Sequence, residues 1–173
     1  METKLPAYSY VPGGPWPHPG RAAEHQGTPK PAVAAIEGDD WVSSSVYLWG
    51  ITLFNAGYYW EAHEAWESLW HAHGRRGPTA DVLKGLIKLA ATGVKIRERQ
   101  PHGVRIHGSR ASTLFEAVAS EHGTRLLGLD LMELARQAAR IANEPPEDPN
   151  TIGEAVSIVF DFRIEPRPGT SIS

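Results

Sequence analysis

The feature that most constrains the fold is a short break, Asn55-Ala56-Gly57, between two stretches of helical periodicity. Asp39 or Asp40 is the expected N-cap of the first helix. Its apolar residues recur at three- and four-residue steps: Val42, Val46, Trp49, Leu53 and Phe54. The next helix begins within two residues of Gly57, so the chain has to fold back on itself. The sequence therefore predicts an antiparallel helix hairpin over residues 40–73.

Three further helices are predicted downstream by the same periodicity and by helix-terminating residues. Thr79 is the expected cap of a third helix that runs from Ala80 to about Arg99. Pro101-His102-Gly103 is expected to separate it from a fourth helix, and Asp130 has the capping-box spacing that starts a fifth. We therefore expect an all-α fold: a compact bundle of about five helices around the central hairpin, with residues 39–145 as the helical domain.

The N-terminal arm, residues 1–38, is rich in Pro and Gly and shows no helical period. Proline removes a backbone donor and fixes φ, so this segment is predicted to be extended. It is either a disordered tail or an ordered strap packed on the core. Its apolar residues favour the strap, because a disordered segment of typical composition has few of them: Tyr8, Tyr10, Val11 and Trp16.

The C-terminal segment, residues 146–173, is predicted to be mostly extended. Large apolar residues occupy every second position in it, which is the period of a strand: Ile158, Phe160, Phe162 and Ile164. A single strand needs a partner. The alternatives are the N-terminal arm and a second subunit, so a homodimer is compatible with the sequence.

Length and composition exclude several classes of protein. A chain of 173 residues suits one domain, and it contains no run of roughly 18 apolar residues that would cross a membrane. The N-terminus does not resemble a signal peptide, which leads us to expect a cytoplasmic protein. The chain has no Cys, so any metal would be held by His and carboxylate ligands. It also lacks a phosphate-binding glycine loop and a nucleophile elbow.

The residues with a chemical role are expected between Phe54 and His73, where six aromatic residues, three His and three Glu share twenty positions. His63 and Glu67 are four residues apart and lie on one face of a helix. They can share a divalent metal ion (Zn, Mn or Ni), form a structural buried pair, or belong to a metal-free polar pocket. Because a catalytic zinc usually has three protein ligands, further ligands would be needed. The candidates are Glu64, His71, His18 and His107.

This part of the chain resembles domain-of-unknown-function family 309, bacterial and archaeal proteins for which an H-x-x-x-E-x-x-W/Y metal-binding motif has been suggested. His63, Glu67 and Trp70 match that motif. The likeness extends through Gly85-Leu86-Ile87, Ala90-Ala91, Lys95, Gly103 and Arg110-Ala111. The sequence departs from the pattern at Arg99, where Gly is common, and at His107, where an apolar residue is usual. The resemblance implies a fold and a suspected metal site, since the family has no established activity.

Charge is distributed unevenly along the chain. Residues 31–74 hold six acidic and no basic residues, whereas residues 84–110 hold seven basic residues and one acidic residue. The two regions either face each other as oppositely charged helices or leave an anion-binding face. The first alternative is favoured and argues against nucleic acid as a partner. Lys95 and Arg110 are expected either to pair with Glu64 or Glu67 or to hold an anionic substrate group.

Two functions are compatible with these residues. The first is a metal-dependent hydrolase of a small substrate, in which an ion on His63 and Glu67 activates water. The alternative is a non-enzymatic helical module whose Trp-rich groove accepts a protein partner and whose His63–Glu67 pair is structural.

Overall fold

The computed structural model describes residues 4–19, 33–151 and 153–169. Its described residues form five α-helices. The helices are α1 (Ser45–Asn55), α2 (Tyr59–Ala72), α3 (Pro78–Arg97), α4 (Pro101–His122) and α5 (Leu131–Asn143). A 3-10 helix, η3 (Asp40–Ser43), precedes α1, and two short strands, β1 (Arg125–Leu126) and β2 (Leu129–Asp130), pair antiparallel before α5. The predicted all-α class is confirmed.

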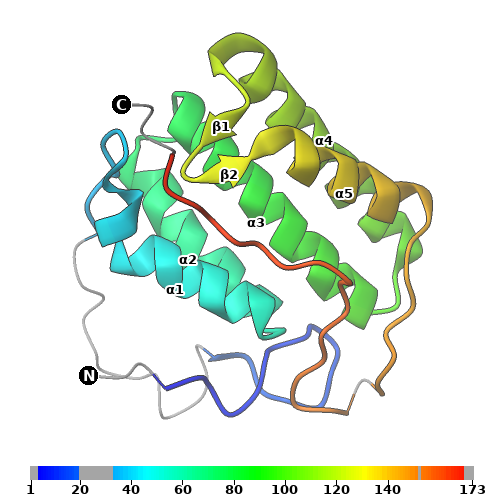
Figure 1. Cartoon of the computed structure of the whole chain (residues 1–173). Coiled ribbons are helices and arrows are strands. Elements are labelled where there is room, and N and C mark those ends of the chain that lie inside the picture. The colour runs from blue at the N-terminus through cyan, green and yellow to red at the C-terminus, as the bar shows by residue number, and fades with distance from the viewer. Residues whose placement is uncertain (1–3, 20–32, 152, 170–173) are drawn as a thin grey trace.

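Successive helices pack against each other, from α1 on α2 through to α4 on α5, and α3 occupies the middle of the array (Figure 1). Every residue of α3 is buried or half-buried. Two glycines allow this close packing. A Cβ atom on Gly93 would lie 2.6 Å from the ring of Tyr59 in α2, and one on Gly85 would lie 2.6 Å from the ring of Phe115 in α4. Within the described residues, no helix is long and apolar enough to span a membrane.

Three predicted helix starts are wrong, and two are confirmed: α2 begins within two residues of Gly57, and α5 begins at its predicted cap. Asp39 and Asp40 lead into η3, and the Oγ of Ser44 caps α1 by accepting a hydrogen bond from the Tyr47 amide (3.3 Å). Helices α3 and α4 begin at prolines, Pro78 and Pro101, rather than after Thr79 and Gly103. Proline has no N–H to leave unpaired and its φ is already helical, so it fits the first position of a helix. The predicted cap Asp130 accepts the amide hydrogen of Glu133 (3.1 Å).

Arg99 makes the turn between α3 and α4, at the position where the sequence departs from the expected glycine. Its φ is 59°, in the left-handed region. The amide of Gln100 donates to the Lys95 carbonyl and that of Arg99 to the Ile96 carbonyl, each at 3.0 Å. These are the two bonds of a Schellman motif, so the turn keeps the geometry that glycine would give.

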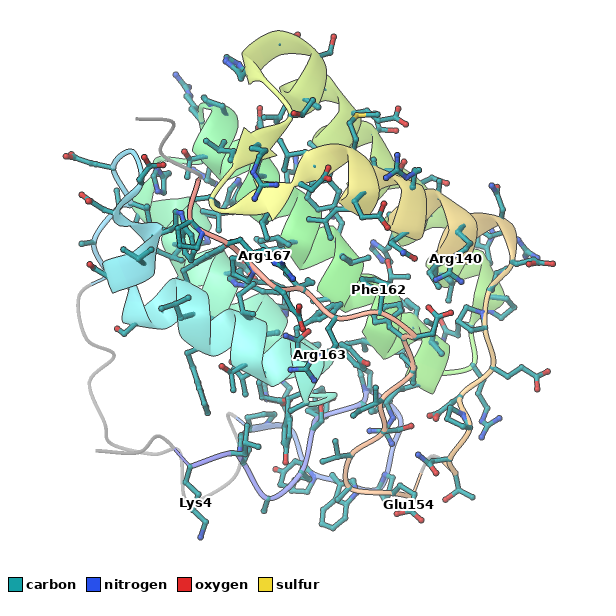
Figure 2. The ribbon with its side chains drawn as sticks, viewed as in Figure 1. Lys4, Arg140, Glu154, Phe162, Arg163 and Arg167 are labelled. Carbon is teal, nitrogen blue, oxygen red and sulfur yellow. The ribbon has the colours of Figure 1, made fainter. Side chains whose placement is uncertain are left out.

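The C-terminal segment passes between α1 and α5 (Figure 1). Phe160 stacks on Phe54 at a ring distance of 5.3 Å. The side chain of Asn55 holds the backbone of Ile164 with two hydrogen bonds of 2.8 Å. Phe162, Arg163 and Arg167 follow one another along the segment (Figure 2). Tyr59 Oη likewise accepts the Val159 amide hydrogen (3.0 Å), so helix side chains bond part of this backbone. In the described residues the N-terminal arm contributes one bond, from Ser9 N to Ala155 O (2.8 Å).

We predict that Gly93→Ala lowers the free energy of unfolding. The new methyl group would meet the ring of Tyr59, which is 1% exposed and cannot move aside. Overpacking of this kind costs about 1–3 kcal/mol, more than the roughly 1 kcal/mol that alanine gains over glycine in a helix. Urea unfolding of the two proteins measures the difference.

Gly103→Ala is the matched control. Its methyl group would meet only the flexible stem of Lys95, with the nearest atom at 2.7 Å. This variant should be at least as stable as the wild type. Equal stability of Gly93→Ala and Gly103→Ala would contradict the close-packing argument.

Candidate functional site

The candidate site lies on the side of the bundle where α2, α3 and α4 reach solvent together. Helix α3 contributes a half-exposed stripe at the helical spacing of three and four residues. Its members are Lys84, Ile87, Lys88, Ala91 and Lys95. Helix α2 contributes His63 and Glu67 on one edge of this stripe, and α4 contributes His107 and Arg110 on the other. We call this surface the α2–α3–α4 face.

His63 and Glu67 form a hydrogen-bonded pair, with Nε2 and Oε2 3.0 Å apart. The His63 side chain is 25% exposed and that of Glu67 is 41% exposed, so the pair is open to solvent. His71, one turn further along, has its Nε2 3.7 Å from the other carboxylate oxygen of Glu67. The predicted helical spacing thus brings three polar side chains into a row on α2.

A small pocket of about 150 Å³ adjoins the His63 side chain. Its lining residues come from the N-terminal arm, α2, α3 and the residue that follows α3: Pro12, Trp60, His63, Ala91, Val94, Lys95 and Glu98. The Nζ of Lys95 lies 2.8 Å from Glu98 Oε2. Lys95 therefore pairs with Glu98, and the expected ion pair with Glu64 or Glu67 is not formed.

The N-terminal arm covers the same end of α2. The half-buried carboxylate of Glu61 accepts hydrogen bonds from Ser9 Oγ (2.7 Å) and from the Tyr10 amide (3.1 Å). Burial raises the pKa of Glu61, and the two hydrogen bonds act in the opposite direction. The rings of Tyr10 and His18 both contact Trp60, at 4.8 Å and 5.6 Å. His18, a predicted ligand, therefore lies against the ring that also contacts His63.

Glu64 and His107 occupy different surroundings from the pair. Glu64 accepts the indole hydrogen of Trp60 (2.7 Å) and is committed to that bond. His107 is half-buried, and its Nδ1 has no hydrogen-bond partner among the described residues. Burial lowers the pKa of His107, and the nearby charges of Lys88, Lys95 and Arg110 lower it further.

A closed metal centre does not fit these donors. No three His, Asp or Glu side chains gather around one point in the described part of the chain. Of the predicted additional ligands, Glu64 is bonded to Trp60, and His107 lies among three cations that repel a divalent ion. His63 and Glu67 are in place as two ligands, which is fewer than the usual three protein ligands of a catalytic zinc.

The comparison with known families agrees with the motif. Residues 47–106 match a family described as domain of unknown function, DUF309, so this part of the chain is similar to that domain. The matched region covers α1 to α3 and the start of α4, and so includes His63, Glu67 and Lys95. No curated protein matches the chain.

Sequence reasoning missed a buried ion pair at the end of α3. Arg97 and Asp148 are 1% and 0% exposed, with Nε and Oδ2 3.3 Å apart. Ser157 Oγ and the Asn150 amide both donate to Asp148 Oδ1, at 2.5 Å and 3.0 Å, and Arg97 also donates to the Glu154 carbonyl (2.9 Å). The signal was present, since Arg97 continues the buried stripe one helical repeat after Ala90. The pair anchors the C-terminal segment and contributes no residue to the α2–α3–α4 face.

We predict that His107→Gln makes the protein less sensitive to mild acid. The folded pKa of His107 is lowered by burial and by three cations, so the folded state binds its proton less readily than the unfolded state. The stability that neutral His107 contributes is present above its unfolded pKa of about 6.5 and is lost as pH falls through the folded pKa. Urea unfolding at about pH 7.5 and about pH 5.5 should show a smaller loss on acidification for the variant.

His107→Leu is the control that shows whether the side-chain amide of the introduced glutamine contributes to the effect. It also lacks a titratable ring, so it should show the same reduced acid sensitivity. If both variants lose as much unfolding free energy on acidification as the wild type does, the acid sensitivity belongs to another group.

Proposed function

We propose that the protein acts on a small molecule bound at the pocket beside His63, with His63 and Glu67 as a general acid–base pair. The observation that carries this proposal is the 3.0 Å contact between His63 Nε2 and Glu67 Oε2 in a solvent-accessible position that adjoins the pocket. Histidine is the commonest general base in enzymes, and a carboxylate that accepts one ring hydrogen fixes the orientation of the ring. The reaction class that fits is hydrolysis of a small substrate.

The assignment of roles follows from the hydrogen bond. If Nε2 carries the hydrogen that Glu67 accepts, Nδ1 is the nitrogen that takes a proton from water. The water then attacks the substrate, and the protonated ring returns the proton to the leaving group. Glu67 stabilises the charge that develops on the ring during this step.

A purely structural role explains this pair less well. Ion pairs and hydrogen bonds at solvent-exposed positions contribute about 0–1 kcal/mol to stability. The fold has stronger anchors, among them the buried Arg97–Asp148 pair and the rings of Tyr59 and Phe115. The interaction-module alternative allows the groove to accept either a partner helix or the chain's own arm. Tyr10 and His18 of the arm contact Trp60, so this ring is less available to a separate protein partner.

His63→Ala should abolish hydrolysis that the wild type catalyses. The measurement is a screen of chromogenic esters and phosphomonoesters, followed by kcat/KM for the best substrate. Loss of a general base lowers the rate by about 100-fold or more, and Glu67→Gln should cost about 10-fold or more because the ring loses its orientation. The matched control is His122→Ala, which removes an exposed His near Glu121 at the end of α4. Equal rates in His63→Ala and His122→Ala would refute the acid–base role.

A divalent ion on His63 and Glu67 is the second candidate. It is favoured by the two donors on adjacent turns of α2, and it requires water or substrate atoms to complete the coordination. The ion would supply a water of lowered pKa as the nucleophile.

Calorimetric titration with Zn²⁺, Mn²⁺ and Ni²⁺ separates the two candidates. The metal candidate predicts saturable binding to the wild type that is lost in both His63→Ala and Glu67→Ala, because each removes one of only two protein ligands. It also predicts that the affinity of the wild type for the metal falls as pH decreases through about 6.5, because a protonated histidine cannot bind a metal. Binding that is equally strong in wild type and variants would exclude a metal at this pair.

A further inference from the structure

A second pocket lies on the α2–α3–α4 face, between α3 and α4. Its volume is about 400 Å³, which is in the range of small-molecule sites. Its lining residues are Lys84, Lys88, Ser109, Arg110, Thr113 and Leu114. Three of the six side chains are cations, two carry hydroxyl groups, and none is acidic. The spacing of four residues on α3 and the packing of α4 on α3 bring these groups together.

The three cations of this pocket have no acidic partner at close range. Lys95, Arg97, Arg136 and Arg140 on the same or neighbouring helices all form ion pairs. In the described part of the chain, Lys84, Lys88 and Arg110 form none within 4.0 Å. Lys84 instead lies 5.9 Å from the centre of the Trp70 ring. The positive charge of the pocket is therefore not neutralised by any ion pair among the described residues.

The cations also repel one another. Burial lowers the pKa of Lys88, and the charges of Arg110 and Lys84 lower it further, while Glu67 acts in the opposite direction. Repulsion between like charges opposes their assembly, and an anion bound among them would relieve it. Two buried polar atoms also lack hydrogen-bond partners among the described residues. They are Nε1 of Trp70, whose ring centre lies 5.9 Å from Lys84 Nζ, and Nδ1 of His107, a ring that feels the charges of Lys88 and Arg110.

We propose that Lys84, Lys88 and Arg110 bind a small, multiply charged oxyanion, and that this group is the phosphate of a phosphomonoester. A guanidinium group donates two parallel hydrogen bonds to phosphate oxygens, ammonium groups supply point charges, and the hydroxyls of Ser109 and Thr113 add further donors. The proposal deepens the proposed function by naming the substrate class. Lys88 lies within electrostatic reach of Glu67, so the anionic group would sit next to the His63–Glu67 pair.

The experiment measures binding of inorganic phosphate by isothermal titration calorimetry at an ionic strength of about 0.15 M, where the Debye length is about 8 Å. The proteins are the wild type, Lys88→Gln, Arg110→Gln and Arg105→Gln. Arg105 is exposed on α4 and does not line the pocket, so Arg105→Gln removes the same charge from the same helix. We expect saturable binding to the wild type that weakens about 10-fold or more in Lys88→Gln and Arg110→Gln, the usual cost of one charge-assisted hydrogen bond. Arg105→Gln should stay within about twofold of the wild type, because a long-range charge change is screened.

Two further probes identify the ligand class. Citrate that binds more tightly than phosphate would overturn the assignment to phosphate in favour of a polycarboxylate. A single-stranded DNA oligomer that binds with a steep salt dependence, and that is weakened equally by all three variants, would replace the pocket with a nucleic-acid surface. Absence of saturable phosphate binding, or equal losses in Arg105→Gln and Arg110→Gln, would also refute the proposal.

The substituted side chains are half-buried or exposed, so the variants should fold, and circular dichroism checks this. The calorimetric measurement of phosphate binding requires no turnover and does not depend on the catalytic role proposed for His63. If the protein binds no phosphate but still catalyses His63-dependent hydrolysis, the proposed substrate class is refuted and the acid–base role of His63 and Glu67 stands. If the protein binds phosphate but catalyses no hydrolysis, the anion site stands and the acid–base role is refuted.

Discussion

The close approach of α2 and α4 to α3 is the constraint on which the rest of the structure depends. The rings of Tyr59 and Phe115 occupy the space that side chains at positions 93 and 85 would need, so both neighbours lie directly against the α3 backbone. Aromatic burial at such contacts is the largest available source of stability. As a consequence α3 is enclosed on both sides and keeps a single half-exposed stripe, whose long lysine stems pack while their ammonium groups reach water.

This enclosure also gives the α2–α3–α4 face its electrostatic character. The acidic and basic regions of the sequence do come together, since Glu67 lies within the field of Lys88. They do not neutralise each other, because Lys95 takes Glu98 from its own helix. The face is therefore polarised across its width, with the His63–Glu67 pair on α2 and the cations Lys84, Lys88 and Arg110 on α3 and α4. A substrate that carries both a reactive group and an anionic group would match that arrangement.

The sequence predicted the parts of the fold that local physical chemistry determines. Five helices could be located because periodicity and helix breakers act within a few residues. The cap at Asp130 could be located because its side chain accepts a hydrogen bond from a backbone amide only three residues away. Pro78 and Pro101 were misjudged because proline ends one helix and suits the first turn of the next. The partners of the C-terminal segment could not be predicted, because its contacts with α1 and α5 depend on how these two helices are arranged in space.

The same distinction applies to the site. His63 and Glu67 are one turn apart on a single helix, so their contact followed from spacing alone. The cation pocket joins Lys84 and Lys88 of α3 with Arg110 of α4, and its existence depends on the register between two helices. That register is set by Gly85 against Phe115, a contact with no pattern in the sequence. Pro12 likewise reaches the His63 pocket only because Ser9 and Tyr10 bind the half-buried Glu61, so this pocket has all of its walls only while the arm is docked on α2.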